Sequence, residues 1–277
     1  MSRQAPQIGD PIALPNFLSV ESSTELSQAF DSNTFNQKEW LDTVEFATEK
    51  LLNLYANNQL TSNAHLYPLT GLLSSLAEFS EQVTVADFGG GYGDNFLRLA
   101  CALNHNVLDR LRYNVIETDL LISKFSNFKI GRNALDPVSL FNIDDLQSPS
   151  SKHRFFPCHL LLLTGSLQYA ENWTQTLTDL LKTGPDFVYI CRTIFNDQLP
   201  SFGCCQDVSP SDGPWQGLFI GRTGVHIFNS VEVIHLFSRL GYEAVSNEIA
   251  QDYSEQLKGL AKLEREGVYR NILLQKV

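Results

Sequence analysis

The stretch that decides the fold is Val83-Thr84-Val85-Ala86-Asp87-Phe88-Gly89-Gly90-Gly91-Tyr92-Gly93. Its apolar first half predicts a buried β-strand that ends near an acid, and residues 95–100 predict a helix. Glycine carries no side chain, so a loop with three alternate glycines can turn tightly and lie close to a ligand. Strand, glycine loop and helix in this order are typical of the opening of a nucleotide-binding α/β domain.

Two common phosphate-binding loops do not fit this stretch. A P-loop needs Lys and then Ser or Thr after its last glycine, whereas Asp94 and Asn95 follow Gly93. The dinucleotide pattern G-x-G-x-x-G needs a third glycine at position 94 or 96, which hold Asp and Phe. An acid at the start of the helix would also repel a pyrophosphate, so both ligand classes are disfavoured.

The pattern that does fit is Asp-x-Gly-x-Gly-x-Gly, formed by Asp87, Gly89, Gly91 and Gly93. It resembles motif I of the class I S-adenosyl-L-methionine (SAM) methyltransferases. In that family the loop wraps the amino-acid end of SAM, and the acid orders the loop or contacts the ligand's ammonium group. The resemblance therefore implies SAM as cofactor, S-adenosyl-L-homocysteine as product, and these four residues with Gly90 as cofactor-binding residues. A glycine-rich turn without a ligand is the alternative.

Composition limits the partners of this chain. Its 277 residues can form one elaborated domain or two small ones, and 43% of them are hydrophobic. The 31 acidic and 20 basic residues give a net charge of −11, and no run of Lys or Arg exceeds two residues. A large polyanion needs a basic surface, so nucleic-acid substrates are not expected.

No targeting or membrane-spanning segment is recognised. Residues 1–20 lack a continuous apolar stretch, and no apolar run approaches the roughly 20 residues of a spanning helix. The five cysteines are an odd number without a C-x-x-C pair, which disfavours a disulfide framework or a zinc site. Cys204 and Cys205 are expected to be free thiols in a loop. We therefore expect a cytoplasmic protein without membrane partners; its oligomeric state, a homodimer included, is open.

Three regions are expected along the chain. Residues 1–20 are rich in Pro, Gln and small residues and predict a loose arm. Residues 21–80 predict a helical extension, with helices at 23–30, 36–55 and 67–79. In class I methyltransferases such an extension often covers the SAM pocket; packing on the sheet edge is the simpler interpretation. Residues 81–277 are the predicted SAM-binding domain.

The third region alternates between strand and helix patterns, which predicts an α/β fold: a Rossmann-like sheet with helices on both faces. Strands are expected at 83–88, 113–117, 139–143, 158–164, 187–192, 242–249 and 268–275. Helices are expected at 95–108, 120–128, 173–182, 231–240 and 253–266. The resemblance implies that this seven-stranded sheet is mostly parallel, with the seventh strand antiparallel and inserted between the fifth and sixth.

Acids at strand ends are the next candidates. Glu117 ends the second predicted strand, where a carboxylate can accept hydrogen bonds from both hydroxyls of a ribose. It occupies the position of the family's ribose-binding acid, and Asp119 is the alternative. Asp144, with Asp145, ends the third predicted strand, where the family places a polar residue near the adenine amine. A solvated turn explains this pair equally well.

The loop after the fourth strand holds Thr164, Gly165, Ser166 and Tyr169. Carboxyl ends of parallel strands line the ligand crevice of open α/β sheets, so the loop is expected to run beneath SAM and past the transferable methyl. Tyr169 is a candidate to face the acceptor or to pack against Trp173. The loop has no acid, so a metal site of the catechol methyltransferase type is not predicted. It also lacks the Asn/Asp-Pro-Pro-Tyr/Phe motif of many amine methyltransferases.

Methyl transfer to oxygen needs a base that removes the hydroxyl proton, and His is the usual choice near neutral pH. His226 lies between the fifth predicted strand and the next helix. The resemblance implies that this insertion forms a wall of the acceptor pocket. His226 is the candidate base, while a surface or packing histidine is the alternative. The same insertion, residues 196–229, holds four aromatic residues that predict either a lid or a satellite hydrophobic cluster: Phe202, Trp215, Phe219 and Phe228.

The sequence thus predicts a SAM-dependent methyltransferase that acts on a small-molecule acceptor, with O-methylation as the expected reaction. Residues 87–93, 165–169 and 192–193, with the later His/Phe-containing loop, look like a loosely defined methyltransferase group. That group is associated with polysaccharide or small-molecule biosynthesis. Three alternatives are a non-methylating SAM enzyme that cyclises or rearranges its substrate, a non-catalytic binding protein, and a nicotinamide oxidoreductase.

Overall fold

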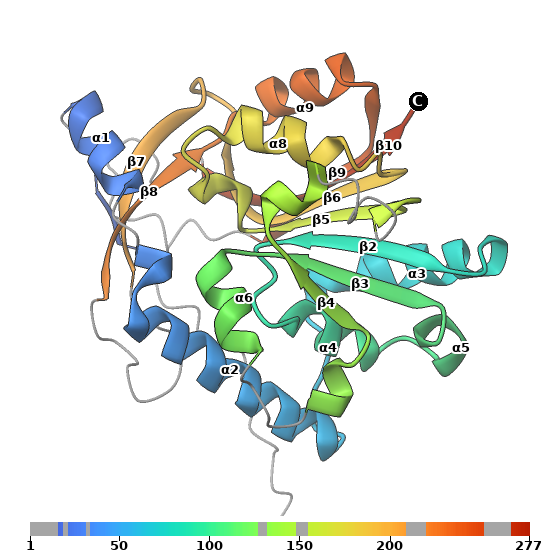
Figure 1. Cartoon of the computed structure of the whole chain (residues 1–277). Coiled ribbons are helices and arrows are strands. Elements are labelled where there is room, and N and C mark those ends of the chain that lie inside the picture. The colour runs from blue at the N-terminus through green and yellow to red at the C-terminus, as the bar shows by residue number, and fades with distance from the viewer. Residues whose placement is uncertain are drawn as a thin grey trace, which may run out of the picture.

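The computed structural model describes residues 16–18, 22–31, 34–126, 132–147, 155–208, 220–251 and 267–277. They form a seven-stranded sheet with helices on both faces and a three-stranded sheet beside it (Figure 1). The predicted helix at 253–266 and the residues Trp215 and Phe219 lie outside the described residues.

The large sheet has the order β4-β3-β2-β5-β6-β10-β9. Its strands are β2 (Val83–Phe88), β3 (Leu111–Ile116), β4 (Val138–Phe141), β5 (Leu160–Thr164), β6 (Phe187–Asn196), β9 (Tyr242–Gln251) and β10 (Gly267–Lys276). The pairs among β2 to β6 are parallel, whereas β10 is antiparallel to both β6 and β9. The seventh strand therefore lies antiparallel between the fifth and sixth, as the resemblance implied.

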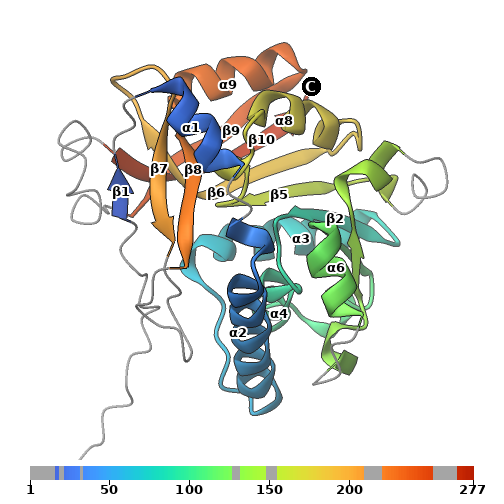
Figure 2. The same cartoon turned by 60° about the vertical axis from the view of Figure 1, so that its left-hand side comes forward.

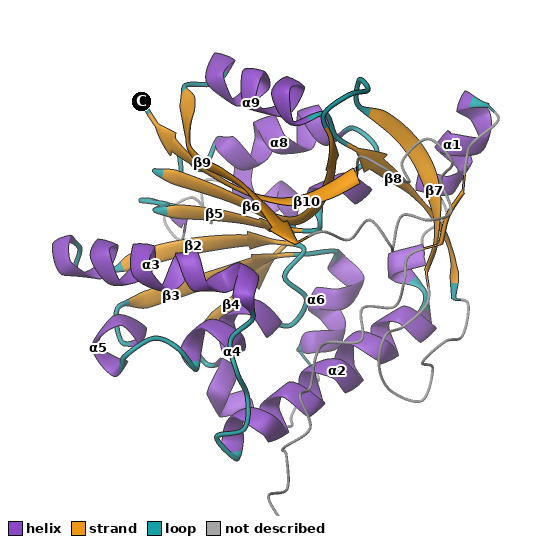
Figure 3. Cartoon of the chain, turned by 180° about the vertical axis from the view of Figure 1, so that it is seen from behind, coloured by secondary structure: helices purple, strands orange, loops and turns teal. Residues whose placement is uncertain are grey.

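Two layers of helices cover this sheet (Figures 1 and 3). Helices α8 and α9 pack on one face, where Leu177 and Phe237 join a core with β5. Helices α3 to α5 pack on the other face, with α2 and α6 beside them. The bounds are α2 (Lys38–Ala56), α3 (Tyr67–Phe79), α4 (Asp94–Ala100), α5 (His105–Leu108), α6 (Asp119–Phe125), α8 (Trp173–Leu181) and α9 (Ser230–Arg239). Short 3-10 helices are η1 (Thr34–Asn36), η2 (Ala64–Leu66), η3 (Arg132–Leu135), η4 (Ile143–Gln147) and η5 (Leu167–Tyr169).

Burial and capping explain these elements. Residues 160–163 of β5 are all leucine and have no exposed surface, as a central strand covered on both faces requires. The Asn172 side chain accepts from the Gln175 N–H at the start of α8, and Asn229 accepts from the Val231 and Glu232 N–H groups at the start of α9. These caps satisfy N–H groups that the helix itself leaves without partners.

The small sheet was not predicted. It consists of β1 (Asn16–Leu18), β7 (Phe202–Val208) and β8 (Gly221–Ile227), and helix α1 (Ser23–Phe30) packs on it (Figure 2). Gly203 and Gly224 of this sheet obscure the strand pattern in the sequence. Both face α1, where a Cβ at Gly203 would collide with Leu26 and a Cβ at Gly224 would collide with Phe30. Tight helix packing, rather than a turn, accounts for these glycines.

Several expected boundaries were wrong. Cys204 and Cys205 lie in strand β7 rather than in a loop; both are buried, and burial raises the pKa of each thiol. The helix expected at 95–108 is two helices, α4 and α5, separated by a turn. Strand β6 continues to Asn196, four residues beyond its expected end (196 − 192).

Candidate functional site

The site lies where the parallel strands end and the chain changes direction. From β2 the chain adds β3 and β4 on one side, and it later adds β5 and β6 on the other, so the switch falls between β2 and β5. Ligands of open α/β sheets bind outside the carboxyl ends of the strands at such a point. The loops after the two strands touch there, because a Cβ added at Gly89 would come 2.5 Å from the Cβ of Ser166.

Glu117 joins the end of β3 to the glycine loop. Its Oε1 accepts a hydrogen bond from the Gly91 N–H at 3.0 Å, and its Oε2 accepts one from the Thr118 N–H at 3.1 Å. Burial raises the pKa of Glu117, and these two hydrogen bonds oppose the rise. Each carboxylate oxygen has a second lone pair, so Glu117 can still accept bonds from a diol.

Asp87 lies beneath the glycine loop. Its Oδ2 accepts from the Tyr113 hydroxyl at 2.7 Å and from Nδ2 of Asn95 at 3.1 Å, and a Cβ added at Gly90 would collide with this carboxylate. The side chain has no exposed surface, and burial raises the pKa of Asp87 to about 7 despite the two hydrogen bonds. Asp87 is thus built into the floor of the loop.

Helix α2 covers the loop from outside. A Cβ at Gly91 would meet Cγ1 of Val44 at 3.7 Å, and the Thr48 hydroxyl donates to Oδ1 of Asp94 at 2.7 Å. Lys124 of α6 forms ion pairs with Asp42 and Glu45 of α2. The helical segment before the core therefore contacts the loop and the first residue of α4, and Figure 2 shows α2 beside α4.

The loop after β5 reaches towards β6. The Gly165 N–H donates to the carbonyl of Cys191 at 2.9 Å, and the Thr164 hydroxyl accepts from the Cys191 thiol at 3.5 Å. The Ser166 hydroxyl is buried and has no hydrogen-bond partner among the described residues. The same is true of Oγ1 of Thr118 and Oδ1 of Asp87, both in segments that border the glycine loop.

Asp144 lies in the segment that follows strand β4. Strand β4 ends at Phe141, and Asp144 is an exposed residue of the following 3-10 helix η4. Its N–H donates to Oδ1 of Asn142, whose own side-chain amide donates to Asp119. The strand end is therefore three residues earlier than the candidate acid (144 − 141).

The two candidate catalytic residues lie beside the small sheet. The Tyr169 hydroxyl donates to Oε1 of Gln206 in β7 at 2.9 Å, and its ring packs edge-on against Phe35 rather than Trp173. Trp173 packs against Phe228 instead. Burial raises the pKa of Tyr169.

His226 is a residue of strand β8, with its ring stacked on Phe30 and Phe228. Its Nε2 lies 3.0 Å from the carbonyl oxygen of Glu171, and burial lowers the pKa of His226 while this hydrogen bond raises it. A carbonyl only accepts, so Nε2 carries the proton of that bond and Nδ1 holds the lone pair when the ring is neutral.

Sequence reasoning missed the residues that support the loop. Asn95 and Tyr113 hold Asp87, and Thr48 holds Asp94. Asn95 is the second residue after Gly93, the last glycine of the loop, so its position could have suggested a role. Tyr113 and Thr48 look like ordinary core residues in a strand and a helix, and only the three-dimensional contacts identify them.

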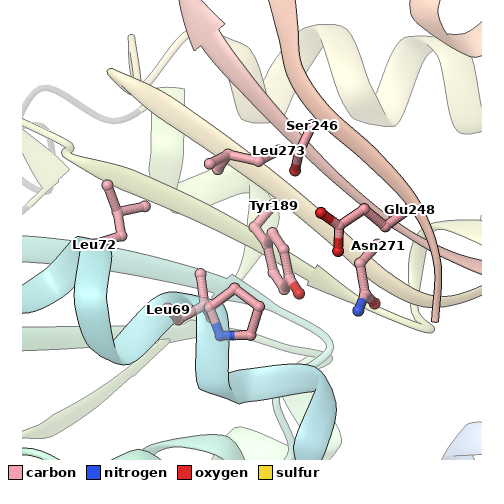
Figure 4. A pocket seen from close by; sticks show the side chains of 8 residues that line it. Leu69, Leu72, Tyr189, Ser246, Glu248, Asn271 and Leu273 are labelled. Carbon is pink, nitrogen blue, oxygen red and sulfur yellow. The ribbon is translucent and has the colours of Figure 1, made fainter.

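Two cavities lie elsewhere. One of about 110 Å³ lies between α3 and the strands β6, β9 and β10, and Figure 4 shows Tyr189 and Glu248 among its lining side chains. Another of about 310 Å³ lies along the Phe46 side of α2. None of the candidate site residues lines either cavity. Within the described ranges, no cluster of three or more His, Cys, Asp and Glu residues could hold a metal ion, and no helix has the length and apolarity to span a membrane.

Comparison with known proteins gave matches in structure alone. No protein-family model and no curated protein sequence matches the chain. Among solved structures it is similar to the [4+2]-cyclase SpnF, with a TM-score of 0.49, 15% identity, and coverage of 76% of this chain and 80% of that chain. It is also similar to 1,6-didemethyltoxoflavin-N1-methyltransferase from Burkholderia thailandensis, with a TM-score of 0.46, 12% identity and 96% coverage of both chains. An O-methyltransferase family protein from the same organism has a TM-score of 0.48, 13% identity, and coverage of 92% of this chain and 67% of that chain.

These scores are below 0.5 and the identities are low, so the assignment of the fold rests on the strand order itself. Six parallel strands and one antiparallel strand in the order β4-β3-β2-β5-β6-β10-β9, with a glycine loop after β2, make up the Rossmann-like fold of the class I methyltransferases. The substrate and the reaction of this particular chain do not follow from its fold.

Proposed function

We propose that this protein is a SAM-dependent methyltransferase that acts on a small molecule. The observation that carries the proposal is the hydrogen bond from the Gly91 N–H to Glu117, which joins the candidate ribose-binding acid after β3 to the glycine loop after β2. The loop lacks the Lys and Ser/Thr of a triphosphate site, and the acids beside it disfavour a pyrophosphate.

The residues present fit SAM. Burying a polar group without a hydrogen bond is costly, and a ligand can satisfy such groups. Three polar atoms without described partners border the loop: Oδ1 of Asp87, Oγ1 of Thr118 and Oγ of Ser166. We assign Glu117 to the ribose hydroxyls, Asp144 to the adenine side, and the remaining contacts to Gly89, Gly90, Gly91, Gly93, Thr164, Gly165 and Ser166. When bound, SAM supplies an electrophilic methyl group.

The helical segment of residues 21–80 is proposed to act as a cap. It packs on the glycine loop through Val44 and holds Asp94 through Thr48. A cap at this place would exclude water and keep the loop in a single conformation, which favours transfer by orientation.

The finer proposal is O-methylation. Burial keeps His226 largely neutral at pH 7, and its Nδ1 carries the lone pair that can accept a hydroxyl proton. Tyr169, fixed by Gln206, would form part of the acceptor wall. In this proposal the acceptor binds between the carboxyl ends of β5 and β6 and the small sheet.

Product mass tests this function. The protein is incubated with SAM carrying a deuterated methyl group and a panel of hydroxylated small molecules, and products are measured by mass spectrometry. One labelled methyl group per product supports methyl transfer. A changed product without the label identifies a cyclisation or rearrangement enzyme and contradicts the proposal, and so does the absence of any SAM-dependent product across the panel.

A further inference from the structure

Arg192 adopts an unusual backbone conformation. Its φ is +52°, in a region that residues other than Gly, Asn and Asp seldom occupy because their side chains crowd the backbone there. It lies in a β-bulge: β10 advances two residues from Arg270 to Ile272, while β6 advances three, from Ile190 to Thr193. Bulges beside active sites redirect a side chain, and this one redirects Arg192.

The bulge lies at the candidate site. The Gly165 N–H donates to the carbonyl of Cys191, and a Cβ added at Gly165 would come 3.0 Å from the carbonyl oxygen of Arg192. The Arg192 side chain is exposed, and neither a hydrogen bond nor an ion pair joins it to another residue within the described ranges. A strained backbone therefore presents a free guanidinium next to the loop after β5.

His65 lies near this guanidinium. Burial, together with the charges of Arg192 and Arg98, lowers the pKa of His65 to about 3, so its ring is neutral at pH 7. Its Nε2 is buried and has no hydrogen-bond partner in the part of the chain that the structure describes. The neutral ring can add a hydrogen bond without adding charge.

The helix η2 that carries His65 is fixed from two sides. The Tyr189 hydroxyl of β6 donates to the carbonyl of His65 at 2.8 Å. Arg98 of α4 donates through Nη1 to Oδ1 of Asn63, the residue before η2, at 2.6 Å. These contacts hold His65 between helix α4 and the bulged strand β6, so it does not depend on a ligand for its position.

Two arginines lie near His65 in an acidic protein whose net charge is −11. Arg192 and Arg98 also act on the carboxylate of Asp94, whose pKa burial raises to about 6 against the opposing effects of Thr48 and both arginines. The exposed guanidinium of Arg192 can attract an anionic group.

We propose that Arg192 binds a carboxylate or phosphate of the acceptor, with His65 as its neutral hydrogen-bonding neighbour. The guanidinium fork matches the geometry of both anions. Arg192 belongs to β6, two strands from β2, which corresponds to roughly 10 Å at the usual strand spacing. This distance favours the acceptor over the cofactor's own carboxylate, and the proposal rests on the function proposed above.

The first experiment maps the anion site without requiring turnover. The protein is treated with phenylglyoxal, which modifies exposed arginines, in the presence of inorganic phosphate, benzoate or chloride, and adducts are quantified by peptide mass spectrometry. Phosphate or benzoate is expected to slow modification of Arg192 about fivefold relative to chloride, because a bound oxyanion shields the guanidinium. Arg239, an exposed arginine of α9, is the matched control and should not be protected. Equal modification of Arg192 in all three salts overturns the proposal.

The second experiment separates acceptor from cofactor. S-adenosylhomocysteine and 5′-methylthioadenosine, which lacks the amino-acid part, are titrated into the wild type and Arg192→Gln. Unchanged dissociation constants in the variant, together with the anion protection, support an acceptor site. A loss of about tenfold for S-adenosylhomocysteine alone places the cofactor's carboxylate at Arg192 and overturns the assignment to the acceptor. Failure of the wild type to bind either nucleoside rejects the proposed function, while the protection experiment still reports on the anion site.

Discussion

Glu117, at the end of β3, holds the glycine loop after β2 through a hydrogen bond from the Gly91 N–H to its Oε1, at 3.0 Å. The two residues are 26 positions apart in the chain, and the parallel pairing of β2 with β3 brings them together. One carboxylate thus orders the loop and keeps lone pairs for a ligand diol.

Replacing Glu117 by Gln should weaken cofactor binding. The amide keeps one acceptor oxygen but loses the charge-assisted hydrogen bonds, which contribute about 1.5–3 kcal/mol each. We expect the dissociation constant of S-adenosylhomocysteine, measured by calorimetry, to rise at least about tenfold. Asp119→Asn is the control, because Asp119 is exposed and accepts from Asn142. If Asp119→Asn weakened binding and Glu117→Gln did not, Asp119 would be the ribose-binding acid instead.

Replacing Gly91 by Val should abolish cofactor binding and leave the protein folded. Gly91 has a φ of +62°, and an added Cβ would make only an ordinary contact with Val44, so backbone strain of about 1–2 kcal/mol is the main cost. Gly71→Ala in α3 is the control: no atom lies within 4 Å of its added Cβ, and the alanine should stabilise the helix by about 0.5–1 kcal/mol. Circular dichroism measures whether each variant is folded, and calorimetry measures its affinity for S-adenosylhomocysteine. Unchanged affinity in Gly91→Val contradicts the role of the loop.

The buried acid Asp87 should make stability depend on pH. Its pKa is raised from 3.8 to about 7 in the folded state, so between pH 4 and 7 the folded protein binds more protons than the unfolded chain. The stabilisation that comes from the protonated carboxyl of Asp87 is fully present below the unfolded pKa of 3.8. It is lost as the pH rises through the folded pKa of about 7.

Asp87→Asn removes this dependence. The free energy of unfolding of the variant relative to the wild type should therefore increase from pH 4 to pH 7 and then level off. Urea denaturation at pH 5, 6, 7 and 8 measures the difference. Asp94, whose pKa burial raises to about 6, is present in both proteins, so the pH dependence of the difference reports Asp87 together with its coupling to Asp94. A difference that does not vary with pH rules out the buried carboxylate as its source.

His226→Gln should lower kcat for a hydroxyl acceptor by about a hundredfold, the range attributed to a general base. Cofactor binding should stay unchanged, because the ring contacts Phe30, Phe228 and Glu171 rather than the glycine loop. His235→Gln, an exposed position on α9, is the matched control. Full kcat in His226→Gln would leave the ring with only a packing role against Phe30.

The sequence predicted the main sheet well because its strands are locally explicit. The apolar runs at β2 and β5 and the glycine loop between β2 and α4 carry their own pattern. The place of β10 between β6 and β9 did not follow from periodicity, since antiparallel insertion depends on contacts between distant segments; the resemblance supplied it. The end of β4 was predicted two residues late (143 − 141), which displaced Asp144 from the strand end.

Local sequence patterns did not predict the small sheet or the residues that hold the candidate site in place. Gly203 and Gly224 look like loop residues until α1 is seen to fill the space beside them. The positive φ of Arg192 arises from the bulge against β10, which a single strand does not encode. Likewise, Thr48 is one of several threonines in the sequence, and only its contact with Asp94 distinguishes it.

The most direct test of the central claim is calorimetric titration of the purified protein with S-adenosylhomocysteine, with NADH as the control ligand. The arrangement of Glu117, Gly91 and Asp87 predicts a dissociation constant in the micromolar range for S-adenosylhomocysteine and no binding of NADH. Heat of binding for NADH alone, or for neither ligand, would contradict the assignment of this loop to SAM.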